Sequence, residues 1–191
     1  MPQAKIIEET KQRITIQNFS FENVPGRKML HRLISLVSEL FKNVKMGNDT
    51  EIDRNFRDLK EFYVILNGYI RKFHNTGFLG MDDDMFTQKK ASDYRIFSYQ
   101  LKIIGYILKD FEYDEAIQEF YRKVEEYFSK IFDAFRKKDE KLAHRLWFEH
   151  RPLEIEGENI IKNNSGDLKY RIKFLLIILK IFRSMTALIY S

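Results

Sequence analysis

The C-terminal stretch from Tyr170 to Ser191, YRIKFLLIILKIFRSMTALIYS, places the tightest limit on what this chain can fold into. If this stretch is a helix, apolar side chains cover nearly its whole circumference, and the cations Lys173, Lys180 and Arg183 interrupt them. Such a helix must be buried, either among other helices or in a membrane. Because the cations shorten its apolar run well below the ~18 residues of a membrane span, we expect burial among helices and no membrane span.

A segment upstream has the same layout as this stretch. Residues 99–111 (YQLKIIGYILKDF) and 170–182 (YRIKFLLIILKIF) align without gaps at a constant offset, 170 − 99 = 71. Six of the 13 aligned pairs are identical: Tyr99/Tyr170, Lys102/Lys173, Ile107/Ile178, Leu108/Leu179, Lys109/Lys180 and Phe111/Phe182. Because the lysines recur at the same places in both segments, we predict an internal duplication.

The apolar pattern along the chain predicts six helices. They are expected at about 27–44, 49–73, 93–112, 117–135, from 142 to a polar turn at 163–167, and from that turn to the C-terminus. Residues 74–89 are expected to form a loop, and Pro152 to kink or end the fifth helix. We therefore predict an all-α fold of two tandem three-helix bundles, repeat one at 27–113 and repeat two at 114–191, with antiparallel sequential helices.

Residues 1–26 differ from the rest of the chain and are expected to be an extended N-terminal segment. Ile14 and Ile16 alternate with Thr15 and Gln17, which is the period of a strand. The segment is predicted to be one short strand, or a hairpin with residues 5–9. Two strands do not form a stable sheet alone, so they must lie on the helices or pair with something else.

Composition and motifs argue against an enzyme. The chain has no cysteine, which removes thiolate metal sites and a cysteine nucleophile and is compatible with a reducing cytoplasm. Its four histidines occur in no E-x-x-H or H-E-x-x-H pattern, and there is no Gly-rich phosphate loop or nucleophile elbow. We predict no catalytic residues and no cofactor. Since the N-terminus lacks the apolar core of a signal peptide, we expect a cytoplasmic protein.

A few acidic and aromatic positions allow two interpretations. Residues 82–84, Asp-Asp-Asp, are of the type that binds Mg²⁺, but no calcium-loop spacing surrounds them and a solvated loop is favoured. Glu154, Glu156 and Glu158 alternate near Pro152 and are expected to face water. Trp147 and Phe148 lie at helical spacing from Leu142 and Leu146 and are expected in the core rather than as a base-stacking platform.

The lysines of the duplicated segments are the candidate contact residues. Lys102 and Lys109, and likewise Lys173 and Lys180, are seven residues apart, so each pair lies on one helix face two turns apart. One interpretation is that lysines snorkel along the wet edge of a buried helix. The other is a pseudo-symmetric cationic groove for an anion or an acidic partner. The net charge of +5, with 5 − 1 = +4 in the last 26 residues, also leaves nucleic acid open as a partner.

At these two helices the chain resembles the PhoU family of phosphate-uptake regulators. Residues 104–109 and 179–184 match the stretches in which the third helix of each family repeat carries its E-x-x-x-D metal ligands. Residues 51–72 look like the second helix of archaeal members. The resemblance covers about residues 27–191 and implies the six-helix fold of two three-helix repeats.

The metal motifs depart from the family pattern. Gly105 and Lys109, then Lys180 and Ser184, stand where the family has Glu and Asp. Because a lysine at a ligand position repels a metal cation, we predict that no metal cluster forms.

The resemblance otherwise implies a non-enzymatic regulator of phosphate uptake and phosphate homeostasis. Such a protein would be an adaptor to a phosphate transporter or sensor. It would also form a homodimer. The alternative is a nucleic-acid-associated regulator that uses the basic C-terminal helix.

Overall fold

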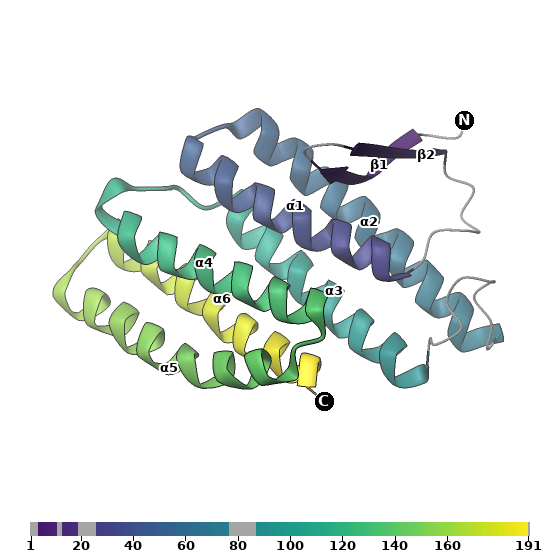
Figure 1. Cartoon of the computed structure of the whole chain (residues 1–191). Coiled ribbons are helices and arrows are strands. Elements are labelled where there is room, and N and C mark those ends of the chain that lie inside the picture. The colour runs from purple at the N-terminus through teal and green to yellow at the C-terminus, as the bar shows by residue number, and fades with distance from the viewer. Residues whose placement is uncertain (1–3, 11–12, 19–25, 77–86, 191) are drawn as a thin grey trace.

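The computed structural model describes residues 4–10, 13–18, 26–76 and 87–190 (Figure 1). Over these residues the protein is built from helices, and the predicted all-α class is confirmed. The helices are α1 (Gly26–Met46), α2 (Asp49–Thr76), α3 (Gln88–Lys109), α4 (Gln118–Lys137), α5 (Glu140–Asn163) and α6 (Asp167–Tyr190), with a one-turn 3-10 helix η1 (Glu115–Ile117) before α4. The predicted helix positions agree with these bounds to within about five residues.

The N-terminal segment contains an antiparallel hairpin of β1 (Ala4–Thr10) and β2 (Arg13–Asn18). Ile6 is in register with Ile16, and a bulge interrupts the pairing between Ile6 and Glu8. β1 packs against α1, so the hairpin rests on the helical body, as a sheet of two strands requires.

The helices form two bundles of three. Helices α1, α2 and α3 pack against one another, and so do α4, α5 and α6. The bundles meet where α1 packs on α4 and α3 packs on α6, with α2 and α5 on opposite flanks (Figure 1). Since α2 contacts α3 but not α6, and α5 contacts α6 but not α3, these four helices follow one another in the order α2, α3, α6, α5.

Helices α3 and α6 run antiparallel, as two sets of polar contacts between them show. The amide of Gln100, near the middle of α3, donates to Ser184 Oγ in the second half of α6 at 2.6 Å. Near the start of α6, the Arg171 guanidinium binds Glu112 at 3.0 Å and Asp114 at 2.8 Å, just beyond the end of α3.

Capping residues and left-handed turns set the helix boundaries. The Thr87 hydroxyl accepts a hydrogen bond from the backbone N–H of Lys90, and the Asp139 carboxylate accepts one from Leu142, so both residues cap a helix N-terminus. Gly47 follows α1 with a φ of +63° and Gly166 precedes α6 with a φ of +66°, values that glycine adopts without strain. The sharp connections let consecutive helices run antiparallel.

Pro152 does not end α5, contrary to one of the outcomes expected from the sequence. The helix is continuous from Glu140 to Asn163. Pro152 and Phe148, whose carbonyl loses its hydrogen-bond donor, both lie on the exposed side of α5. Water can hydrate that carbonyl there, which lowers the cost of the missing bond.

Two glycines in helices give opposite expectations for alanine substitution. At Gly157 of α5 a Cβ atom would lie 2.6 Å from Leu176 Cδ2 and 2.7 Å from Phe120 Cζ, both in the core. Gly157→Ala should therefore lower the free energy of unfolding by about 1–3 kcal/mol. At Gly68 of α2 nothing lies within 4 Å, and Gly68→Ala should raise it by about 0.5–1 kcal/mol. Urea denaturation measures both; equal stability of the two variants would contradict the packing around Gly157.

Candidate interaction surface

Large apolar side chains that face solvent are concentrated on α3 and α6. Of ten such residues in the described parts of the chain, six belong to these two helices: Ile96, Tyr99, Tyr106, Tyr170, Phe174 and Ile177. α4 contributes none of the ten, and α1 contributes Met46 at its last turn. The expectation that the C-terminal helix is buried all round is thus wrong for one of its sides, where Phe174 and Ile177 are each 45% exposed.

We define the α3/α6 face as the solvent-facing side of these two helices. Its residues are Ile96, Tyr99, Lys102, Ile103, Tyr106 and Lys109 on α3, and Tyr170, Lys173, Phe174, Ile177, Lys180 and Arg183 on α6. The opposite sides of the two helices pack on α1 and α4 in the core.

The burial patterns of α3 and α6 coincide at the offset of 71 residues. Within the aligned residues 99–111 and 170–182, five pairs are buried in both segments: Leu101/Ile172, Ile104/Leu175, Gly105/Leu176, Leu108/Leu179 and Phe111/Phe182. Three pairs are exposed in both: Tyr99/Tyr170, Tyr106/Ile177 and Lys109/Lys180. The residues that the two segments share therefore include surface positions as well as core positions, so both helices present similar side chains to solvent.

The lysines of α3 lie along its border with α2. The Lys102 ammonium is 4.5 Å from the centre of the Tyr63 ring and 5.7 Å from that of Tyr106. The Lys109 ammonium is 5.5 Å from the centre of the Phe56 ring. Aromatic rings attract a cation above their face, so these contacts hold both side chains along the border.

The lysines of α6 lie elsewhere on the face. The Lys173 ammonium is 5.1 Å from the ring centre of Tyr170 on its own helix. Lys180 lies one turn before Arg183, whose guanidinium is 4.4 Å from the ring centre of Trp147 on α5, so Lys180 is on the α5 side of α6. The structure thus brings Lys102 and Lys109 to one edge of the face, beside α2, and Lys180 to the other edge, beside α5, with apolar side chains between them.

Carboxylates are missing from the face. No Asp or Glu occurs between Tyr94 and Lys109, or after Asp167. Among the described residues, Lys102, Lys173 and Lys180 form no ion pair, and Lys109 reaches a carboxylate only at 3.9 Å, in the neighbouring Asp110. The α3/α6 face is therefore apolar and cationic with little internal neutralisation.

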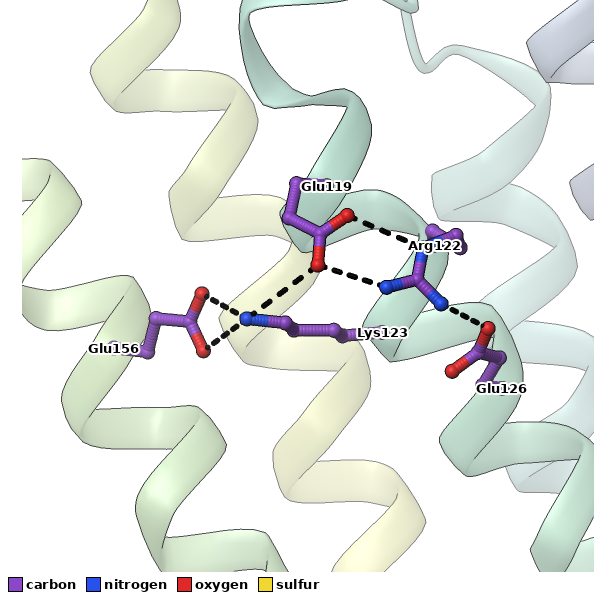
Figure 2. A network of polar contacts seen from close by, with 5 residues as sticks. All are labelled: Glu119, Arg122, Lys123, Glu126 and Glu156. Carbon is purple, nitrogen blue, oxygen red and sulfur yellow. Dashed lines mark hydrogen bonds and ion pairs between the residues drawn. The ribbon is translucent and has the colours of Figure 1, made fainter.

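The surface of α4 shows the opposite arrangement (Figure 2). The Arg122 guanidinium binds Glu119 at 2.8 Å and also binds Glu126, while the Lys123 ammonium binds Glu156 of α5 at 2.8 Å and lies 3.7 Å from Glu119. The hydrogen bond from Arg122 lowers the pKa of Glu119. Cations on this surface have carboxylate partners, and the network connects α4 with α5 rather than leaving charge for a ligand.

Sequence reasoning missed a buried polar pair in α5. His150 is 1% exposed, and its Nδ1 lies 3.9 Å from Glu154 Oε2, which accepts a hydrogen bond from Arg151 at 2.6 Å. The expectation that Glu154 faces water is wrong, since its burial is nearly complete, whereas Glu158 is exposed. A signal was available in the sequence. The buried residues Ala143, Leu146, His150 and Gly157 are three, four and seven positions apart, which places them on one face of the helix.

Trp147 and the four positions that align with the PhoU metal motif, Gly105, Lys109, Lys180 and Ser184, differ in their burial and in their contacts. Trp147 is half-buried, and the Arg183 guanidinium lies 4.4 Å from its ring centre. The expectation that Phe148 lies in the core is wrong, because it is 63% exposed on the outer side of α5. Gly105 is in the core, where a Cβ would meet Leu59, whereas Lys109 and Lys180 are exposed. Ser184 accepts the hydrogen bond from Gln100 and donates one to the carbonyl of Ile181.

These positions therefore do not converge on one point. Within the described ranges, no three His, Asp or Glu side chains are grouped as metal ligands would be. The acidic run at 82–84 lies outside the described residues.

Comparisons with known proteins place the chain in no family. No protein-family model, no curated protein and no solved structure matches it. Across the residues that the structure describes, no helix combines the length and the apolar character needed to cross a membrane.

The buried His150 should make stability depend on pH. Burial lowers the pKa of His150 below its ordinary 6.5, so below about pH 6.5 the unfolded chain binds more protons than the folded one. The free energy of unfolding should therefore fall as the pH drops from 7.5 to 5.5, and His150→Gln should reduce that fall. The pKa of Glu154 is lowered from 4.5, mainly by Arg151, so its contribution persists over this range. Urea denaturation at several pH values tests this; an unchanged slope in the variant would contradict it.

Proposed function

We propose that this protein is a non-enzymatic regulator that acts as a helical adaptor and binds a partner protein through the α3/α6 face. The observation that carries the proposal is the gathering of six exposed large apolar side chains on two adjacent helices. Contiguous apolar surface costs free energy in water and commonly marks an interaction site. The lysines that border these side chains add a charge preference that scattered surface residues would not have.

The chemistry of the face favours binding over catalysis. It presents lysine, aromatic and aliphatic side chains, and it presents no histidine and no pair of carboxylates that could exchange a proton with a substrate. The buried His150 and Glu154 lie on α5 with Arg151 closing over the carboxylate, an arrangement that fits an internal ion pair.

The sequence resemblance to PhoU-type regulators supports the physiological role within this proposal. The order of six helices in two bundles fits that resemblance. The partner would then be a component of a phosphate transporter or a phosphate sensor in the cytoplasm, and the adaptor would act as a homodimer.

Site-specific photocrosslinking tests the adaptor role. A photoreactive amino acid at position 177, in the centre of the face, should capture a protein from nuclease-treated extract of the native cell, and mass spectrometry should identify a transporter or sensor component. The same group at position 46, exposed at the end of α1, is the matched control and should not capture that protein. Capture of the same proteins at both positions, or of none at 177, would contradict the proposal.

A nucleic-acid-associated role is the second candidate, and the cations of α6 favour it. Three of the five are engaged within the protein, however: Arg171 binds Glu112 and Asp114, Arg183 lies over Trp147, and Lys173 lies over Tyr170. If duplex DNA is the ligand, log-log plots of affinity against salt should fall steeply, with a slope of about −0.9 per phosphate contacted. Lys109→Glu with Lys180→Glu should then reduce that slope. A shallow slope that the substitutions leave unchanged would remove this candidate.

A further inference from the structure

We infer that the α3/α6 face binds an acidic amphipathic helix of another protein, with an apolar stripe bordered by carboxylates on both sides. This inference rests on the proposed function, because it assumes that the face is the contact surface. It adds the chemistry of the partner, which follows from where the apolar and charged side chains lie on the two antiparallel helices.

The middle of the face is apolar. In sequence, Tyr106 is midway between Gln100 and Glu112, and Ile177 is about midway between Ser184 and Arg171, the residues that join the two helices. Tyr106 and Ile177 are therefore at the same level along the two antiparallel helices, and the Tyr106 ring also packs against Phe56 of α2, with ring centres 4.8 Å apart. Tyr106 and Ile177 are each 45% exposed, so a partner can still remove a large part of both side chains from water.

The charged side chains lie towards the edges of this apolar centre. Lys102 and Lys109 stand beside α2, held over Tyr63 and Phe56, and Lys180 stands on the α5 side of α6, one turn before Arg183, which lies over Trp147. Each lysine pair spans seven residues, or about 10.5 Å along its helix. A partner helix with carboxylates seven residues apart on both borders of its apolar stripe would match this spacing in charge and in length.

A second copy of this chain does not fit the face. In a symmetric dimer the same surface meets itself, so Lys102, Lys109, Lys173 and Lys180 of one copy would approach the same cations of the other. The face offers no Asp or Glu of its own to pair with them. Like charges brought together at an interface are unfavourable, and the occupant must therefore supply the carboxylates itself.

The occupant is a helix rather than an added strand. Backbone N–H and C=O groups in the middle of α3 and α6 are already paired within their helices, so the face has no strand edge to extend. Recognition must come from side chains that pack into the grooves between residues of α3 and α6, which is how amphipathic helices are bound.

Binding of synthetic peptides tests the inference. The probe is a fluorescent 18-residue peptide with a leucine stripe bordered by glutamates. One control peptide has the same composition in scrambled order, and another has lysines in place of the glutamates. Anisotropy titrations should show the acidic amphipathic peptide binding at least about tenfold more tightly than either control, because a difference of 1.4 kcal/mol is a factor of ten. Equal binding of the amphipathic and scrambled peptides would overturn the inference.

Charge-reversal variants locate the binding. Replacing Lys102, Lys109, Lys173 and Lys180 by Glu changes the net charge from +5 to −3, since 5 − 4 × 2 = −3. The matched control replaces Lys28, Lys42, Lys137 and Lys141, exposed on α1, α4 and α5, with the same change in net charge. The face variant should lose at least about tenfold in affinity and the control far less, because charges more than ~8 Å away are screened at physiological salt. Equal losses in the two variants would overturn the inference.

A second pair of variants tests the apolar centre without changing charge. Phe174→Ser with Ile177→Ser should weaken peptide binding, and Met46→Ser, at an exposed apolar site off the face, should not. All substituted side chains are largely exposed, and circular dichroism should show unchanged helix content. If the centre variant binds the peptide as tightly as the unaltered protein, the apolar stripe has no role and the inference fails.

Other occupants give different results in the same assays. The face could bind vesicles with anionic lipid, or duplex DNA, more tightly than it binds the peptide. That result would overturn the inference in favour of those ligands. If crosslinking at position 177 captures a protein that the face variant still binds, the acidic-helix inference fails while the adaptor role stands. If crosslinking captures no protein at all, the adaptor role fails, whatever the peptide does.

Discussion

Four aromatic rings from three helices hold the two halves of this protein together. Phe128 of α4 stacks on Phe182 of α6 with ring centres 5.1 Å apart, and Phe41 of α1 lies 5.8 Å from Phe128 and 6.4 Å from Phe182. The fourth ring, Tyr121 of α4, meets Phe41 at 5.7 Å. Its hydroxyl donates a hydrogen bond of 2.8 Å to the Phe41 carbonyl, so this buried polar group is satisfied, and burial raises its pKa. Because the cluster takes rings from both bundles, neither bundle can complete its core alone.

The orientation of α3 and α6 follows from this shared core. With α1 and α4 packed on their inner sides, and α2 and α5 on the flanks, the outer sides of α3 and α6 have no helix to cover them. These outer sides still carry tyrosine, phenylalanine and isoleucine. Leaving such side chains in water forgoes about 25 cal/mol for each Å² that burial would remove from it. A binding partner would recover that free energy, which links the packing of the core to the proposed adaptor role.

Charge is distributed differently on the α3/α6 face and on the surface of α4 and α5. Two ion pairs connect α4 with α5: Lys123 binds Glu156, and Lys130 binds Glu149 at 3.2 Å. Exposed pairs of this kind add little stability each, but they leave little net charge on that side. The lysines of the α3/α6 face are instead held mainly by aromatic rings, which attract a cation without neutralising it. An anionic partner is therefore attracted to a place where apolar surface is also exposed.

The sequence by itself determined the number and positions of the helices, and which lysines share a face. Apolar residues recurring every three to four positions mark a helix, and lysines seven residues apart must lie on the same side of it; both follow from local geometry. The tertiary structure decided which sides are covered. An almost wholly apolar helix such as α6 carries no local signal for the side that its neighbours leave open, and Phe174 and Ile177 were for that reason expected to be buried. Glu154 is buried because α5 packs against α6, and Pro152 is tolerated because its side of α5 faces water. Each of these outcomes depends on contacts between residues far apart in the chain, which the local pattern does not contain.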